Sequence, residues 1–165
     1  MAAVGGPPAQ TARGAREVLA RRLAAQWVEP ARSTGARTAV VEVVRHLLAL
    51  QAQDFAQSCW ALGARAPGST AADVDAAYDS GAIVRSWPLR GTLHVTTPDD
   101  LRLMLALTAT KTVRGMAARH RQLDLDDDTF ARAREIARAE LAGGGAASRE
   151  EFLAQLTAGG VDVGG

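Results

Sequence analysis

The sequence has little of several residue types, and each shortage narrows what the chain can be. Its one cysteine, Cys59, leaves no partner for an internal disulfide, which fits a reducing compartment. Its one lysine is Lys111, so a lysine Schiff base has a single candidate. No apolar run approaches the roughly 18 residues of a membrane span, and the opening residues lack the apolar stretch of a signal peptide. We therefore expect a cytoplasmic protein that does not enter a membrane.

Several functional motifs are also missing. The sequence contains no His, Cys or Asp cluster at metal-ligand spacing, no P-loop, no dinucleotide-binding glycine pattern and no Gly-x-Ser-x-Gly turn. We therefore expect no cofactor and no metal. Cys59 could be a nucleophile, but a small buried hydrophobic side chain is the favoured interpretation.

The distribution of charge says more than its sum. The formal net charge is only +1, which by itself predicts no partner. Between Arg13 and Arg45, however, seven arginines face three acids, and the acids gather elsewhere, as in the DLDDD run from Asp124 to Asp128. Such segregation is typical of a surface that binds a polyanion. A surface that becomes mixed after folding is the alternative.

Apolar spacing and capping signals divide the chain into elements. Thr70 with Asp73, and Ser148 with Glu151, have the spacing of capping boxes, while Thr97 followed by a proline is a strong helix start. Together these signals predict helices over residues 15–27, from 38 to about 50, and over 57–62, 70–81, 97–121, 127–141 and 148–159.

A change to period-two alternation predicts a hairpin from residues 83–87 and 92–96. Its expected apolar set is Val84, Leu93 and Val95, and its expected alternate set is Arg85, Thr92 and His94. Helices followed by such a hairpin predict a mostly α fold with small β wings, built as tandem winged-helix domains. The expected parts are a disordered tail (1–12), a first winged-helix domain (13–122), and a linker helix with the start of a second, interrupted winged-helix domain (123–165).

Two glutamines, Gln51 and Gln53, stand where an apolar run should close a helix. Residues two apart point to opposite sides of a helix but to the same side of an extended segment. For both amides to hold one water molecule, the helix must therefore end near Leu50. On these residues alone, a pair of solvent-facing or packing amides is the favoured alternative.

Three stretches around these glutamines resemble a known family. LLALQAQD (47–54), WALGAR (60–65) and VRSWPLRGTLHVTTPDDL (84–101) are similar to the N-terminal part of the AlkZ/YcaQ superfamily of winged-helix DNA glycosylases. The final SREEFLAQLTAGGVDVGG resembles the start of that family's next winged-helix repeat, so we expect an N-terminal fragment. YcaQ-type relatives carry Gln-x-Asp, whereas Gln53 here favours the AlkZ-like branch.

The resemblance implies a monofunctional DNA repair glycosylase that acts on double-stranded DNA as a monomer near the nucleoid. Its substrates would be alkylated purines that carry positive charge at N7 or N3, extending to bulky adducts or interstrand crosslinks. Gln51 and Gln53 would position the water that attacks C1′. An amide cannot take up a proton at neutral pH, but a cationic purine leaves without being protonated. Positioning and local dipoles are then sufficient to assist the reaction.

Further site residues follow from the same comparison, each with an alternative. Asp54 could support catalysis, but a helix cap is favoured. His94 could also support it, but a satisfied structural residue is favoured. Trp87 could stack on a base, but a position in the core is favoured. The expected DNA-binding residues are Arg85, Arg90, Thr92, Lys111, Arg114 and Arg121, some of which could instead pair with acids or lie on a solvated helix face.

The competing function is a non-catalytic winged-helix DNA-binding protein or transcriptional regulator. A regulator needs a recognition helix with polar residues at its exposed positions. The segment 45–50 is too apolar for that role, which disfavours the regulator. A catalytically inactive remnant is a third hypothesis.

Overall fold

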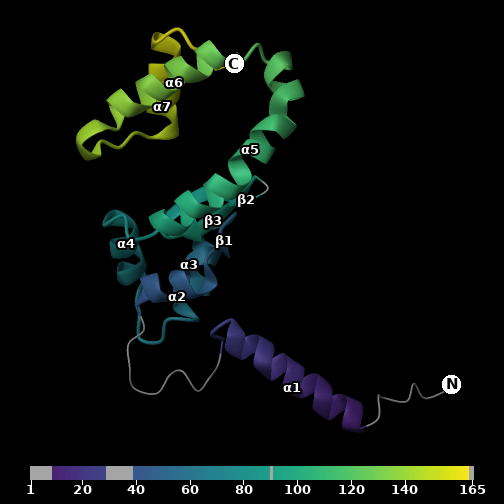
Figure 1. Ribbon diagram of the computed structural model, residues 1–165. Helices are drawn as coiled ribbons and strands as arrows, with labels where there is room; N and C mark the ends of the chain where they lie inside the picture. Colours follow the sequence, from purple (N-terminus) through teal and green to yellow (C-terminus); the bar gives the residue numbers. More distant parts are fainter. Residues whose placement is uncertain (1–8, 29–38, 90, 164–165) are drawn as a thin grey trace, which may run out of the picture. The chain divides into compact units, whose positions relative to one another are not determined.

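The structure, a computed structural model, describes residues 9–28, 39–89 and 91–163 (Figure 1). The chain divides into two compact units, Met1–Thr110 and Lys111–Gly165, and the division falls within a helix at residue 110, where we expected 122. The elements are α1 (Ala9–Ala25), α2 (Val40–Leu47), β1 (Leu50–Gln51), α3 (Phe55–Gly63), α4 (Ala71–Asp79), β2 (Val84–Leu89), β3 (Thr92–Thr96), α5 (Pro98–Gln122), α6 (Asp127–Glu140), the 3₁₀ helix η2 (Ala142–Gly144) and α7 (Arg149–Ala158). The expected mostly helical chain with a small antiparallel sheet is confirmed.

Helix α1 begins at residue 9 and not at residue 15, so residues 9–12 of the expected tail are helical, while residues 1–8 lie outside the described part. Its end is tied to α2. The Trp27 ring stacks on the His46 ring with 4.1 Å between centroids, and His46 Nε2 lies 2.8 Å from the Ala25 carbonyl. Because a carbonyl only accepts, that ring nitrogen donates the hydrogen bond.

The core of the first unit forms where α2 meets α3, α4 and the sheet. Val43 and Val44 of α2, Leu62 of α3 and Val95 of β3 are completely buried. Each such side chain stabilises the fold by about 1.5–3 kcal/mol relative to an exposed one. The apolar face predicted for this helix extended to Leu48, but Leu48 is 44% exposed because the helix has already ended.

The three strands form an antiparallel sheet in the order β1-β3-β2. The central strand β3 therefore pairs on both sides, and His94 lies opposite Gln51 on β1 and Ser86 on β2. Strand β1 was not predicted as a strand, although its L-Q-A-Q alternation carries a period-two signal.

A β-bulge lies in β2, where the residues from Ser86 to Leu89 face the shorter stretch from His94 to Thr92. The inserted stretch contains Pro88, which has no N–H for the ladder. The bulge shifts the register by one residue, so that Arg85 pairs with Val95. The sequence-based assignment of Arg85 to the face opposite Val95 was therefore wrong, and Val84 shares the face of His94 instead.

Several helix ends have the predicted caps. Thr70 and Asp73 form a capping box at α4, and Ser148 and Glu151 form another at α7. The hydrogen bonds from Ser148 hold the pKa of the Glu151 carboxyl below its usual range. Local sequence signals were sufficient here because both partners lie within one helical turn.

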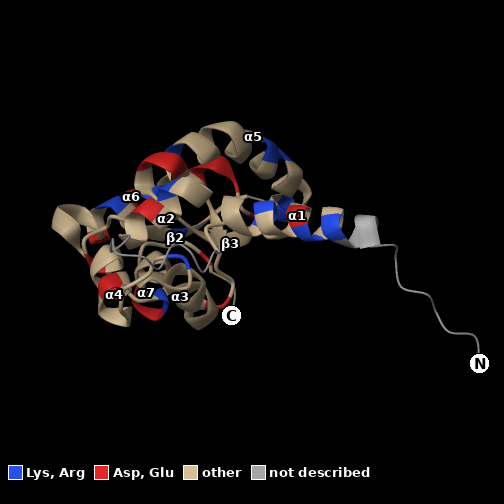
Figure 2. Cartoon of the chain, turned by 90° about the horizontal axis from the view of Figure 1, so that it is seen from below, with Lys and Arg blue, Asp and Glu red and all other residues tan. Residues whose placement is uncertain are grey.

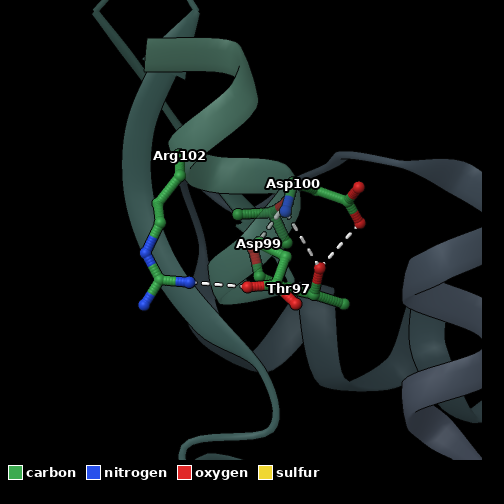
Figure 3. A network of polar contacts seen from close by, with 5 residues as sticks. Thr97, Asp99, Asp100 and Arg102 are labelled. Carbon is green, nitrogen blue, oxygen red and sulfur yellow. Dashed lines mark hydrogen bonds and ion pairs between the residues drawn. The ribbon is translucent and has the colours of Figure 1, made fainter. Parts of the chain in front are cut away.

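The start of α5 is also capped as predicted (Figure 3). The Asp100 N–H donates to Thr97 Oγ1 at 3.2 Å, and the Thr97 hydroxyl donates to Asp100 Oδ2 at 2.7 Å. Asp99 forms an exposed ion pair with Arg102 at 2.5 Å. Both acids lie in the first turn, where the helix dipole favours negative charge.

The second unit contains the later half of α5 followed by α6, η2 and α7. Asp126 caps α6 by accepting the Thr129 N–H at 2.8 Å, and the bonds from Thr129 lower the pKa of its carboxyl. Leu156 of α7 and Val161 after it are buried, while Gly159 lies so close to Ile136 that a Cβ would collide with that side chain.

Candidate active site around Gln51 and Gln53

Two residues, Leu48 and Ala49, separate helix α2 from strand β1, and the chain turns at Leu48. Leu48 has φ 63° and ψ −49°, and the Ala49 N–H donates to the Leu47 carbonyl at 2.7 Å. This is the strained form of γ-turn, which is rare for a residue with a side chain. The buried Thr96 of β3 donates its hydroxyl to the Leu48 carbonyl at 2.9 Å and so holds the turn against the sheet.

After this turn Leu50 and Gln51 form the short strand β1, and buried and exposed residues alternate from Leu50 to Gln53. Leu50 and Ala52 are 8% and 1% exposed and face the core, whereas Gln51 and Gln53 are exposed. Alternate residues of an extended segment point to the same side. The condition on the helix end is therefore met, since α2 ends before Leu50, and a common side for the two exposed amides stays a prediction.

The side chain of Gln53 continues the hydrogen bonding between β1 and β3. The Ala52 N–H donates to the Leu93 carbonyl at 2.8 Å, and the Leu93 N–H donates to Gln53 Oε1, also at 2.8 Å. A backbone N–H can only donate, so the amide oxygen of Gln53 is the atom turned toward β3. The amide NH₂ of Gln53 remains as a hydrogen-bond donor for a ligand.

His94 lies directly opposite Gln51 on the neighbouring strand β3. Its Nδ1 is 2.8 Å from the Thr92 carbonyl, which assigns the ring proton to Nδ1. In the neutral ring, Nε2 is then an acceptor. Gln51, Gln53 and His94 thus supply both donor and acceptor groups around one end of strands β1 and β3.

Asp54 caps the next helix, as the favoured alternative predicted. Its Oδ1 accepts the Gln57 N–H at 2.9 Å at the N-terminus of α3, which begins at Phe55 and so slightly earlier than expected. Catalytic support from Asp54 stays a prediction, with one carboxylate oxygen already committed to the cap.

Arg85 is partly buried, and its guanidinium is bonded within the protein. Its Nε donates to the Ala52 carbonyl at 2.8 Å and its Nη2 donates to the Gln53 carbonyl at 3.0 Å, with the group 5.9 Å from the Phe55 ring centroid. Arg90 lies outside the described residues. Phosphate contacts by Arg85, Arg90 and Thr92 stay predictions.

Three other residues have clear positions. Trp87 is 62% exposed, so its assignment to the core was wrong, and stacking on a base stays a prediction. Cys59 packs against the core, and its burial raises the pKa of its thiol, with a smaller contribution from the charge of Asp75. The raised pKa disfavours a nucleophile, and the partial burial of Cys59 meets the favoured interpretation of a buried hydrophobic side chain in part.

The basic stripe of α5, formed by Lys111, Arg114 and Arg121, belongs to the second unit. Lys111, Arg114 and Arg121 are all exposed. Figure 2 shows basic and acidic residues along the helices, with the acids of α5 confined to its beginning. Exposure fits both a phosphate-binding stripe and a solvated helix face.

Over the ranges that the structure describes, no group of His, Cys, Asp and Glu side chains is arranged to hold a metal ion. Within the same ranges, none of the helices combines the length and the apolar character needed to span a membrane.

Residues 44–164 match the family model described as DNA glycosylase AlkZ-like. The chain belongs to this family. The match covers both glutamines, the hairpin and α5 to α7, and it confirms the resemblance inferred from the sequence. Comparison with curated proteins and with solved structures gave no match.

Membership of the AlkZ-like family makes this chain a DNA glycosylase-like enzyme with DNA as its substrate class. Sequence reasoning missed the bonds that shape its site: Thr96 on the γ-turn, Leu93 on the Gln53 amide, and Arg85 on two carbonyls. They join residues about 30 to 50 positions apart, and no local spacing signals such contacts.

Proposed function

We propose that the chain hydrolyses the N-glycosidic bond of cationic N7- or N3-alkylated purines in double-stranded DNA, with Gln51 and Gln53 positioning the water. The water oxygen bonds to C1′, and the purine leaves with the electron pair of the broken bond, which neutralises its charge. The proton of the water passes to solvent. A neutral leaving group removes the need for a general acid, so two amides are adequate partners.

The observation that carries this proposal is the exposure of both amides on either side of the buried Ala52. The Gln53 oxygen is bonded to the Leu93 N–H, so Gln53 offers its NH₂ to the water oxygen. Gln51 offers a carbonyl oxygen that can accept from the same water. One donor and one acceptor fix both the position and the orientation of the nucleophile, which lowers the entropic part of the barrier.

The element order supports a winged-helix domain in the first unit. Helix α2, strand β1, helices α3 and α4 and the β2–β3 hairpin follow one another, with β1 pairing to β3. Helices α6 and α7 would then open a second winged-helix repeat, as the resemblance implies.

The charge of α4 argues against the regulator. This helix lies just before the hairpin, where a helix-turn-helix protein places its recognition helix. It carries Asp73, Asp75 and Asp79 and no basic residue between Ala71 and Asp79. An acidic helix is repelled by phosphates, so we place the DNA at the β1–β3 end of the unit.

The remaining attributes extend the same proposal. Lys111 is the only lysine of the sequence, which supports a monofunctional enzyme without a Schiff-base lyase step. We propose a monomer that acts in the cytoplasm on nucleoid DNA, with bulky adducts and interstrand crosslinks among its substrates. Arg90, Thr92, Lys111, Arg114 and Arg121 are its proposed phosphate contacts.

The test measures alkali-labile strand breaks in duplex DNA that contains N7-methylguanine, using the protein expressed from its complete gene. Wild type is compared with Gln51→Ala and Gln53→Ala, and Gln57→Ala is the matched control, because Gln57 is an exposed glutamine of α3 outside the paired segment. We expect breaks with wild type and Gln57→Ala, and a rate lower by about 10²–10³ in the other two variants.

Two outcomes would contradict the proposal. Equal rates in all four proteins would remove the glutamines from the chemistry. Salt-dependent DNA binding without breaks, on either N7-methylguanine or a crosslinked substrate, would favour the non-catalytic DNA-binding protein.

A further inference from the structure

The hydrogen bonds of Arg85 to backbone carbonyls suggest a role inside the protein, whereas its position in the hairpin suggested a phosphate contact. Arg85 begins on β2, in one cross-strand row with Val95 of β3 and Leu50 of β1. Residues in one row share a face of the sheet, and Val95 and Leu50 are buried. Arg85 therefore leaves the sheet on its core side and reaches across β3 to the far edge strand.

The β-bulge at Trp87 and Pro88 produces this direction. If the register of Leu89 with Thr92 continued without interruption, Arg85 would pair with Thr96 and point to the other face. The bulge is anchored, since the Thr108 hydroxyl of α5 donates to the Pro88 carbonyl at 2.8 Å. The β-bulge in β2 therefore turns the Arg85 side chain toward the core side of the sheet.

The atoms that Arg85 reaches are the consecutive carbonyls of Ala52 and Gln53, at 2.8 and 3.0 Å. The other edge of this segment is bonded to Leu93, through the Ala52 N–H and the Gln53 amide oxygen. The segment is therefore fixed from two directions, by β3 through one edge and by Arg85 through its carbonyls. Those two attachments decide where the Gln53 side chain begins and which way its NH₂ points.

We propose that Arg85 is a positioning residue that sets the Gln51–Gln53 segment for catalysis. The inference rests on the proposed function. Nε and Nη2 form one planar edge with parallel donors, which matches two neighbouring acceptors in a way that a lysine ammonium does not. The same edge could form a bidentate contact with a phosphate, but its two donors are already bonded to the Ala52 and Gln53 carbonyls. Arg85 acts through the amides and does not touch the reacting atoms.

The first test separates positioning from phosphate binding. Arg85→Lys keeps the charge and loses the planar edge, and Arg102→Lys is the matched control, because the contact of Arg102 is the exposed Asp99. Single-turnover release of N7-methylguanine is measured at saturating enzyme, together with DNA affinity across a range of salt concentrations. We expect Arg85→Lys to slow release by about 10²-fold with an unchanged salt slope, and the control to change neither quantity.

An unchanged release rate at saturation would overturn the proposal. A phosphate contact would instead lower the salt slope by about 0.9 in an Arg85→Gln variant, with release unaffected once the DNA is bound. Thermal unfolding of each variant, followed by circular dichroism, establishes that the compared proteins are folded.

A double-mutant cycle separates positioning from a general loss of structure. Arg85→Lys is introduced into the Gln53→Ala protein and release is measured again. If Arg85 acts through this amide, its effect shrinks to less than about tenfold in that background, because coupled residues are not additive. A full loss of about 10²-fold in both backgrounds would overturn the proposal.

A final measurement, by hydrogen exchange and NMR, does not depend on enzymatic activity. In the Arg85→Lys protein we expect faster amide hydrogen exchange at Leu93 and a shifted NMR resonance of the Gln53 side-chain NH₂, with exchange at the buried Val43 unchanged. Identical spectra in the two proteins would overturn the positioning role. Failure of the wild-type enzyme to release any base would contradict the proposed function alone, since this arm reports on the segment directly.

Discussion

Gln51 and His94 lie directly opposite each other on strands β1 and β3, and Ser86 follows in the same row on β2. In this row the Nδ1 proton of His94 is bonded to the Thr92 carbonyl, so Nε2 is the acceptor of the neutral imidazole. The proposed water would therefore lie near the imidazole of His94 as well as the two amides.

His94 provides the first prediction. We expect His94→Ala to slow base release by about 10²-fold, because the water loses an acceptor beside Gln51. Ser86→Ala is the matched control, since it changes the same row on the other side of His94 and should leave the rate within about twofold. Single-turnover kinetics on N7-methylguanine DNA measures both. Equal rates in the two variants would make His94 a structural residue of β3.

Thr96 provides the second prediction. Thr96→Val keeps the shape of the side chain but leaves the Leu48 carbonyl without its hydroxyl donor, which should lower the free energy of unfolding by about 1–3 kcal/mol. Urea denaturation measures this change. Thr96→Ser retains the hydroxyl and should recover the hydrogen-bonding part of the loss. If valine and serine are equally destabilising, the γ-turn does not depend on this bond.

The basic stripe of α5 provides the third prediction. Removing Lys111, Arg114 or Arg121 should each reduce the dependence of log affinity on log salt by about 0.9 for duplex DNA, because each phosphate contact releases a counterion. The matched control is Arg138→Ala at the end of α6. Fluorescence anisotropy at several salt concentrations measures the slopes. Slopes equal to wild type in all variants would identify the stripe as a solvated helix face.

Cys59 provides the fourth prediction. Burial, and secondarily the negative charge of Asp75, raises the pKa of the thiol, so a smaller fraction is thiolate at any given pH. We expect Cys59 to react with iodoacetamide more slowly than a free thiol at pH 8, with the midpoint of its rate–pH profile shifted upward. Mass spectrometry of the alkylated protein follows the reaction. A midpoint below that of a free thiol would reopen the nucleophile hypothesis.

Much of this fold could be predicted from local signals in the sequence. Both capping boxes, the start of α5 at Thr97 and the hairpin are where neighbouring residues indicated them, because each depends on partners a few positions apart. The chemical requirement that the helix end near Leu50 is also met, since α2 ends at Leu47 and Leu50–Gln51 form a strand. Asp54 likewise caps α3 as favoured.

The errors arise where geometry depends on distant residues. Arg85 was assigned to the wrong face because an unseen bulge around Pro88 changes the register by one residue. Leu48 was assigned to a buried helical face, although its carbonyl is bonded to Thr96 and the helix has already ended there. Neither effect leaves a periodic mark on the sequence, since each results from a contact between elements.

The two-residue connection at Leu48 and Ala49 has a consequence for how the Gln51–Gln53 segment can vary. Only Leu48 and Ala49 separate α2 from β1, and the turn that they form is bonded to Thr96, so an added or deleted residue would displace the strand. A one-residue insertion before Leu50 would exchange the two sides of the extended segment, driving both amides into the core and exposing their apolar neighbours. The spacing between α2 and α3 is therefore as strict a requirement of the proposed active site as the identity of Gln51 and Gln53.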